Sequence, residues 1–234
     1  MRTGGRTTAE ITPAVATEET LARQWRTTIV RLSDEVELRG IPTGDVSADA
    51  ATLRVSRPGT ITAATVAVQG RDVFTVASIY ALWERPLGMD APIWADASAH
   101  RLLSDLAPLV GRRLPLLVSG DWNILRGYGE YGDAYWGGRY QTVFDRAEAM
   151  GLAFVGPEHP NGRHAEPWPD ELPEGSTCVP TFHHSRQSPE TATRQLDFVF
   201  ASKSLASRIG TEALNEPDEW GPTDHCRVQI DVDV

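Results

Sequence analysis

The chain has 234 residues, enough for one large or two small domains, and its 41% hydrophobic and 23% charged residues are typical of a globular protein. No apolar run approaches the roughly 20 residues that span a bilayer, and the first residues lack a signal-peptide core, so a cytoplasmic location is expected. The net charge of −10 argues against broad capture of duplex nucleic acid, although a local basic strip can coexist with an acidic metal site.

The first half of the chain is rich in strand-like segments. Residues 1–22 show little periodicity, so we expect a mobile tail before a single domain at residues 23–234. Strands are predicted at residues 27–32, 36–41, 53–56, 61–68 and 73–80. The links at residues 33–34 and 69–72 both predict hairpin turns.

The second half mixes helices, strands and one long loop. Residues 96–110 and 139–150 are predicted to be helices, because apolar residues gather on one face of the first and a glycine ends each. A long loop is expected at residues 156–180. Further strands are predicted at residues 114–118, 179–183, 195–201 and 227–234, with a short helix at 203–209. Strands in hairpins with few helices indicate an α+β sandwich. Cys178 and Cys226 lack metal or disulfide spacing and are expected to be buried free thiols.

Three acidic motifs stand beside apolar, strand-like runs. Residues 119–123 read SGDWN, residues 195–200 read QLDFVF and residues 223–225 read TDH. A sheet that gathers these segments at one edge would place three carboxylates, an amide and an imidazole around one cleft. Such groups can hold a hard divalent cation and hydrolyse a phosphate ester.

The first motif has two interpretations. Asp121 and Asn123 lie two residues apart, so on an extended chain their oxygen atoms would point the same way and could share a water, a metal or a phosphoryl oxygen. The alternative is a plain strand-to-loop turn, because Gly, Asp and Asn all favour such corners.

The other two motifs suggest a carboxylate–imidazole pair. Asp197 interrupts a hydrophobic strand, and a buried carboxylate needs a partner, for which His225 is the natural candidate. The alternative is a surface Asp on an edge strand. Asp224 and His225 can serve one site only within a bend, which Gly221-Pro222 favours; the alternative is a turn with a satisfied histidine.

Three further features carry less chemical information. Residues 127–132 (GYGEYG) match G-x-G-x-x-G, but in an unsuitable context for a dinucleotide site. Nearby aromatic residues could stack on a base, although packing of the loop onto the domain is the simpler expectation. They are Tyr128, Tyr131, Tyr135, Trp136 and Tyr140. Alternation on a strand lets only one of His183 and His184 contact a phosphate.

In chain order the motifs resemble those of the endonuclease/exonuclease/phosphatase superfamily, which includes AP endonucleases, pancreatic-type deoxyribonucleases, neutral sphingomyelinases and inositol polyphosphate 5-phosphatases. GDWN at 120–123 is similar to the family's G-D-x-N, LDFV at 196–199 to its L-D-Y strand and TDH at 223–225 to its terminal S-D-H. VASIY at 76–80 and VPTF at 179–182 also resemble family segments. The resemblance covers about residues 27–234 and implies a DNase-like α/β sandwich of two mixed, mostly antiparallel sheets with helices outside.

The resemblance also implies catalytic roles. Asp121 would orient or deprotonate the attacking water, and Asn123 would hold a phosphoryl oxygen. His225, supported by Asp197, would bind the phosphate or act as general base, and Tyr80 would contact the phosphate or the leaving oxygen. The implied activity is phosphoester hydrolysis, by a phosphodiesterase, nuclease or phosphatase.

The implied cofactor is Mg²⁺ or Mn²⁺, with Asp224, Asp121 and Asn123 as candidate metal contacts. Family members also carry an N-terminal strand with an Asn and a later strand that ends in Gln-Glu, whose Glu binds the metal, and neither motif is found here. The sequence is therefore expected to be N-terminally shortened relative to the family, with an inner strand missing. The competing interpretation is an impaired or inactive remnant that acts as a binding module. The fold does not choose among nucleic acid, phospholipid head group and inositol phosphate.

Overall fold

The computed structural model describes residues 9–11, 27–48, 52–83 and 94–234. Its centre is a six-stranded mixed sheet with the order β3-β6-β7-β8-β10-β9. These strands are β3 (Val36–Ile41), β6 (Ile61–Val68), β7 (Arg71–Tyr80), β8 (Leu116–Asp121), β10 (Asp197–Ser202) and β9 (Leu152–Gly156). Neighbours are antiparallel except for β7 and β8, which are parallel. A short parallel pair, β4 (Thr43–Gly44) and β5 (Leu53–Arg54), lies apart from this sheet.

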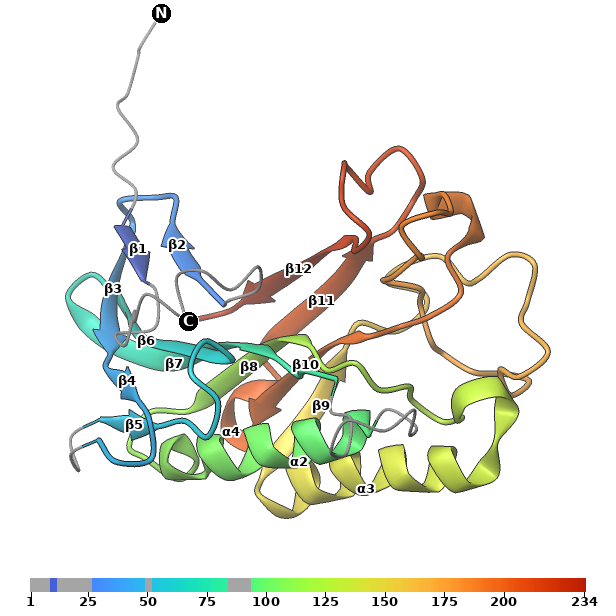
Figure 1. Cartoon of the computed structure of the whole chain (residues 1–234). Coiled ribbons are helices and arrows are strands. Elements are labelled where there is room, and N and C mark those ends of the chain that lie inside the picture. The colour runs from blue at the N-terminus through green and yellow to red at the C-terminus, as the bar shows by residue number, and fades with distance from the viewer. Residues whose placement is uncertain (1–8, 12–26, 49–51, 84–93) are drawn as a thin grey trace, which may run out of the picture.

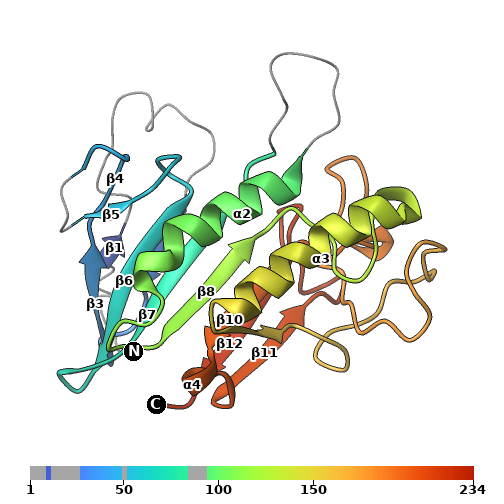
Figure 2. The ribbon, with the colours of Figure 1, turned by 90° about the horizontal axis from the view of Figure 1, so that it is seen from below.

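Helices cover one face of the sheet (Figures 1 and 2). α2 (Ala95–Leu106) continues into a short 3-10 turn at Ala107–Leu109, and α3 (Ala134–Ala149) lies beside it. Their apolar stripes and the sheet residues facing them form one buried core. None of the helices in the described ranges has the length and apolar character of a membrane span.

Two strand pairs lie on the opposite face (Figure 1). β11 (Ile209–Leu214) pairs with β12 (Arg227–Val232), and β1 (Ala9–Ile11) pairs with β2 (Ile29–Arg31), both antiparallel. The short helix α4 (Lys203–Ala206) joins β10 to β11. Apolar residues of β8 and β10 pack against those of β12 in a second core. The predicted α+β sandwich is confirmed. The second layer of its described part consists of these two pairs.

The expected hairpins have different outcomes. The β6–β7 hairpin is confirmed, and Gln69 (φ 50°) and Gly70 (φ 75°) form its two-residue turn in the left-handed region. The expected hairpin at residues 33–34 is wrong, because β2 pairs with β1 whereas β3 pairs along its whole length with the longer β6. Most of the expected N-terminal tail lies outside the described residues, but its residues 9–11 form β1.

Several element boundaries also differ from expectation. α3 begins five residues before the predicted 139, because Asp133 caps its start and the helix continues through Gly137 and Gly138. β9 and β11 were not predicted, and residues 179–183 form only isolated bridges through Phe182. Both cysteines are free and buried, as expected.

Candidate active site

Three adjacent strands bring Tyr80, Asp121 and Asp197 into one row. Tyr80 on β7 is the register partner of Asp121 on β8, and Asp121 is the partner of Asp197 on β10. Phe198, the next residue along β10, belongs to the core on the helical side, so alternation turns Asp197 toward the second layer. The candidate site therefore lies at one end of the sheet, between its two layers.

The SGDWN segment forms a turn that holds its carboxylate in place. A side chain at Gly120 (φ 150°) would collide with the Ile79 backbone, so β7 can approach only because this residue is glycine. Buried Trp122 donates from Nε1 to the Phe198 carbonyl at 3.1 Å. Asn123 adopts a left-handed conformation (φ 51°), which places its amide beside Asp121. Their proximity thus comes from a turn rather than from strand alternation.

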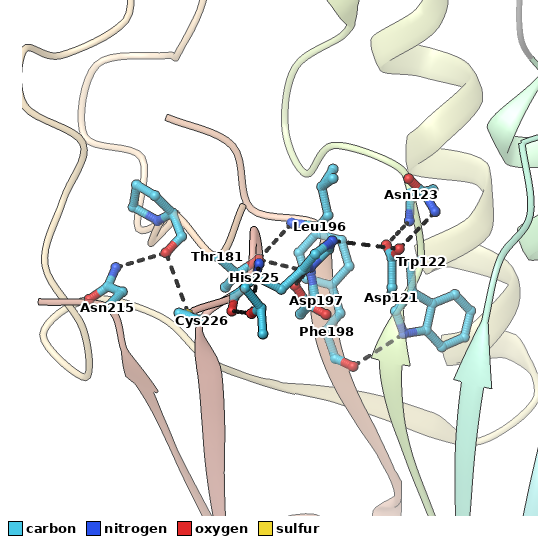
Figure 3. Close-up of polar contacts among 12 residues, drawn as sticks. Asp121, Trp122, Asn123, Thr181, Leu196, Asp197, Phe198, Asn215, His225 and Cys226 are labelled. Carbon is cyan, nitrogen blue, oxygen red and sulfur yellow. Dashed lines mark hydrogen bonds and ion pairs between the residues drawn. The ribbon is translucent and has the colours of Figure 1, made fainter. Parts of the chain in front are cut away.

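Asn123 uses both protons of its side-chain amide on the protein. Its Nδ2 donates to Asp121 Oδ2 at 2.8 Å and to the Ala81 carbonyl at 2.8 Å. Its backbone N–H donates to Asp121 Oδ1 at 2.9 Å (Figure 3). The Asp121 carboxylate is therefore fixed by hydrogen bonds to both oxygen atoms.

His225 joins the two aspartates from the second layer (Figure 3). It lies just before β12, in a bend that includes Gly221 (φ 78°). Its Nδ1 lies 2.8 Å from Asp197 Oδ2, and its Nε2 lies 3.9 Å from Asp121 Oδ2. The second distance is too long for a hydrogen bond. Hence Nε2 and Asp121 face each other across a small gap.

Burial and charge shift the ionisation of the site. Burial, with a smaller contribution from the charge of Asp197, raises the pKa of Asp121 to about 7. Burial opposes the charged form of His225, but the hydrogen bond and charge of Asp197, together with Asp121 and Asp224, raise its pKa to about 9. Burial also raises the pKa of the Tyr80 phenol. Near neutral pH, therefore, His225 is an imidazolium and Asp121 is close to its midpoint.

Thr181 is a residue of this site whose role was not predicted. It is fully buried, and its hydroxyl accepts hydrogen bonds from the backbone N–H groups of Leu196 (3.0 Å) and Asp197 (3.1 Å). The next ring, Phe182, packs against His225 at 5.0 Å. The VPTF pattern indicated that this segment resembles one in the family, but it did not predict the hydrogen bonds by which Thr181 holds the start of β10.

Asp224 lies at the exposed margin of the site. Its backbone carbonyl accepts from the His183 N–H at 3.0 Å, and its charge contributes to raising the pKa values of Tyr80 and His225. Within the described ranges, no three Asp, Glu, His or Cys side chains are arranged as a ready-made metal cluster. The charges of Asp121, Asp197 and Asp224 nevertheless all act on a single imidazolium, a surplus of negative charge that fits a hard cation. Mg²⁺ commonly takes only one or two protein carboxylates and completes its coordination with water and phosphate.

No family model and no curated protein matches the sequence. Several solved structures, however, match the structure of the chain. The endonuclease domain of TRAS1, a telomere-specific non-LTR retrotransposon, matches with a TM-score of 0.59 and 12% identity over 97% of this chain and 80% of that one. An AP endonuclease from Archaeoglobus fulgidus has a TM-score of 0.56 and 17% identity over 88% and 74% of the two chains.

A third match is the 3'-5' exonuclease NExo from Neisseria meningitidis, with a TM-score of 0.55 and 17% identity over 88% of this chain and 75% of that one. At such identities the likeness concerns the fold. It agrees with the architecture that the three sequence motifs predicted. The chain has the α/β-sandwich fold of these nucleases, which is the fold that its resemblance to the endonuclease/exonuclease/phosphatase superfamily implies.

Proposed function

We propose that the chain is a divalent-metal-dependent phosphoester hydrolase. The observation that supports this most is the arrangement of Asp121, Asp197 and His225, which come from three distant segments of the chain. His225 lies between the two aspartates, with Nδ1 2.8 Å from Asp197 Oδ2 and Nε2 3.9 Å from Asp121 Oδ2. We call these three residues the catalytic cluster. The TRAS1 domain and NExo, which share the fold, are named as an endonuclease and an exonuclease.

His225 and Asp121 have complementary roles in this proposal. Asp197 holds Nδ1, so Nε2 points at the gap in front of Asp121 and can donate a proton to a phosphoryl oxygen. Asp121 Oδ2 lies across from Nε2, and its ionised carboxylate can accept a proton from an attacking water. The water and the phosphoryl oxygen would bind beside Nε2 and Oδ2, since a separation of 3.9 Å leaves no room for both between them.

Tyr80 and Asn123 support this pair. The raised pKa of Tyr80 keeps its phenol protonated at neutral pH, so it can donate to the phosphate or to the leaving oxygen. Both amide protons of Asn123 are already donated to Asp121 and Ala81. We therefore assign Asn123 the role of positioning Asp121, in place of direct contact with a phosphoryl oxygen.

Mg²⁺ or Mn²⁺ would be held by Asp224 and by Asp121, with the carbonyl oxygen of Asn123 as a third candidate contact. When bound, the cation would neutralise charge on the phosphate and on the leaving oxygen. It would also lower the pKa values of the carboxylates that hold it, because a positive charge favours their ionised form.

Release of nitrophenol from bis(4-nitrophenyl) phosphate tests the proposal. We expect activity with Mn²⁺ or Mg²⁺, loss of activity with chelator, and loss in Asp121→Ala and His225→Ala. Asp231→Asn, on the exposed side of β12, is the matched control. Activity that ignores chelator, or that survives both substitutions, would refute the assignment. No activity under any condition would favour the impaired remnant that acts as a binding module.

A further inference from the structure

A cavity of about 530 Å³ lies beside the catalytic cluster. Asn123 lines it, and the same residue holds Asp121, so the cavity and the cluster share a wall. The other walls include four large aromatic side chains. They are Trp83, Tyr131, Trp136 and Tyr140. We call this space the aromatic cavity.

One wall of the aromatic cavity is rigid. Tyr140 is buried in the helical core, and Trp136 packs against Tyr140 and edge-on against Trp94. α3 carries both residues and is anchored at its start by Asp133, which accepts a hydrogen bond from the Tyr135 N–H. Packing within the protein therefore explains the presence of an aromatic ring at Tyr140, and it explains much of the placement of Trp136.

Packing does not account for the other two aromatic residues of the lining. Trp83 is 55% exposed and Tyr131 is 91% exposed, and both border the same cavity. Tyr131 also has a left-handed backbone (φ 54°), a conformation that disfavours a side chain of this kind. Exposed aromatic rings around a concave space are typical of a ligand site, and strained residues gather at such sites.

The charges distinguish the aromatic cavity from a neighbouring one. In the aromatic cavity, Glu130 and Asp133 outnumber Arg194, which already pairs with Glu130 at 2.8 Å. A second cavity, of about 520 Å³, shares Trp83, Asn123, Glu130 and Arg194 with it. The second cavity adds His183, His184 and Arg186, so it is the more basic of the two. An anionic phosphate is therefore favoured in the second cavity, and a neutral ring in the aromatic one.

We propose that the aromatic cavity binds a single unpaired nucleobase, whose own phosphoester lies at the catalytic cluster. This inference rests on the proposed hydrolase function and adds a substrate class to it. Bases stack on aromatic side chains through their faces, which suits a cavity that four aromatic rings line. The Glu130–Arg194 pair offers an acceptor and a donor to the edge of the base. A base within a duplex is stacked between its neighbours, so its faces are not available to these rings.

Binding of nucleosides without phosphate tests the cavity apart from catalysis. Adenosine and thymidine would be titrated by calorimetry, with methyl β-ribofuranoside as the sugar without a base. We expect the nucleosides to bind and the sugar alone not to bind. Trp83→Ala and Tyr131→Asn should each weaken nucleoside binding by about fivefold or more, since both remove a stacking surface.

Tyr135→Asn is the matched control, because Tyr135 is also exposed, lies four residues from Tyr131 and does not line the cavity. Trp83 and Tyr131 are exposed, so their variants should keep the circular dichroism spectrum of the parent protein. Equal binding of the sugar alone, or unchanged binding in both cavity variants, would overturn the proposal.

Hydrolysis then separates this proposal from the proposed function. Thymidine 5'-(4-nitrophenyl phosphate) should be cleaved with about tenfold higher kcat/KM than methyl 4-nitrophenyl phosphate, and Trp83→Ala should abolish that preference. Hydrolysis of both diesters without preference would refute the nucleobase site and leave the hydrolase. Nucleoside binding without any hydrolysis would refute the hydrolase and leave the nucleobase site.

Discussion

Asn123 links the catalytic cluster to the aromatic cavity, because it holds Asp121 and lines the cavity, but the two regions are built in different ways. In the cluster, both oxygens of Asp121 accept hydrogen bonds from Asn123, and Asp197 is hydrogen-bonded to His225. These groups lie between two packed layers. In the cavity, Trp83 and Tyr131 project into solvent. The cluster is ordered before any ligand arrives, whereas the cavity keeps apolar surface uncovered.

This difference follows from what each region is proposed to do. Charge stabilisation in phosphoryl transfer requires groups fixed before the reaction, because reorganising them would raise the barrier. Recognition of a ring requires surface that remains available for the ligand to cover. Substitutions in the cluster should therefore affect turnover and ionisation, and substitutions in the cavity should affect substrate choice.

Asp197→Asn should have the largest effect. It keeps the size of the side chain but removes the charge that holds the His225 imidazolium, so the pKa of His225 should fall toward its ordinary value. We expect kcat/KM for a nitrophenyl diester to fall by about 100-fold or more. NMR titration of the His225 ring measures the pKa, and a ring that still titrates near pH 9 would contradict the pairing.

Thr181→Val tests how the start of β10 is held. Valine keeps the volume but leaves the buried N–H groups of Leu196 and Asp197 without an acceptor. We expect the free energy of unfolding to fall by about 1–3 kcal/mol, and activity to fall with it because Asp197 is displaced. Urea denaturation measures the first effect. Thr181→Ser, which keeps the hydroxyl, should keep both stability and activity close to those of the parent protein. Thr211 is a buried threonine away from the cluster, so Thr211→Val should leave activity unchanged.

The comparison also separates what the sequence could predict from what it could not. Asp121 and Asp197 could be found because each lies at the end of an apolar strand, and the register of β8 and β10 then pairs them. His225 could be found because it comes just before the last strand, as a natural partner for Asp197. For the aromatic cavity, the sequence offered Tyr131, Trp136 and Tyr140 among the rings that could stack on a base. It could not place them around one space with Trp83, since that depends on how the loops that carry Trp83 and Glu130 pack beside Asn123. Loop conformation over such distances leaves no periodic signal.

The same distinction explains the errors in the fold. β6 and β7 were predicted well because their alternation and their Gln69-Gly70 turn are local features. The partner of β2 was wrong because pairing depends on which strand is available in three dimensions. β11 was missed because Gly210 and Glu212 weaken its apolar alternation, although Thr211 and Ala213 face the interior.

Asp121→Asn should show that the position of Asp121 in the cluster lowers the free energy of unfolding when its carboxyl group is ionised. The folded pKa of Asp121 is about 7, above the ordinary value near 3.8, so ionisation destabilises the fold as pH rises between these values. Asparagine cannot ionise. With chelator present, we expect the variant to be more stable than the parent by about 1–3 kcal/mol at pH 8, and no more stable at pH 4. If the stability difference between the variant and the parent is the same at both pH values, the pKa of Asp121 is not raised by folding.

Tyr131→Asn should give the smallest effect and the clearest contrast between the regions. Asparagine tolerates the left-handed backbone better than tyrosine, and the Tyr131 ring contributes little packing because it is 91% exposed. We expect a gain of up to about 1 kcal/mol in the free energy of unfolding, measured by urea denaturation beside Tyr135→Asn, which should show no gain. If Tyr131→Asn instead destabilises the protein, the ring supports the fold, and its exposure would no longer indicate a ligand site. A gain in stability with weaker nucleoside binding would mean that the strain at Tyr131 is retained for recognition.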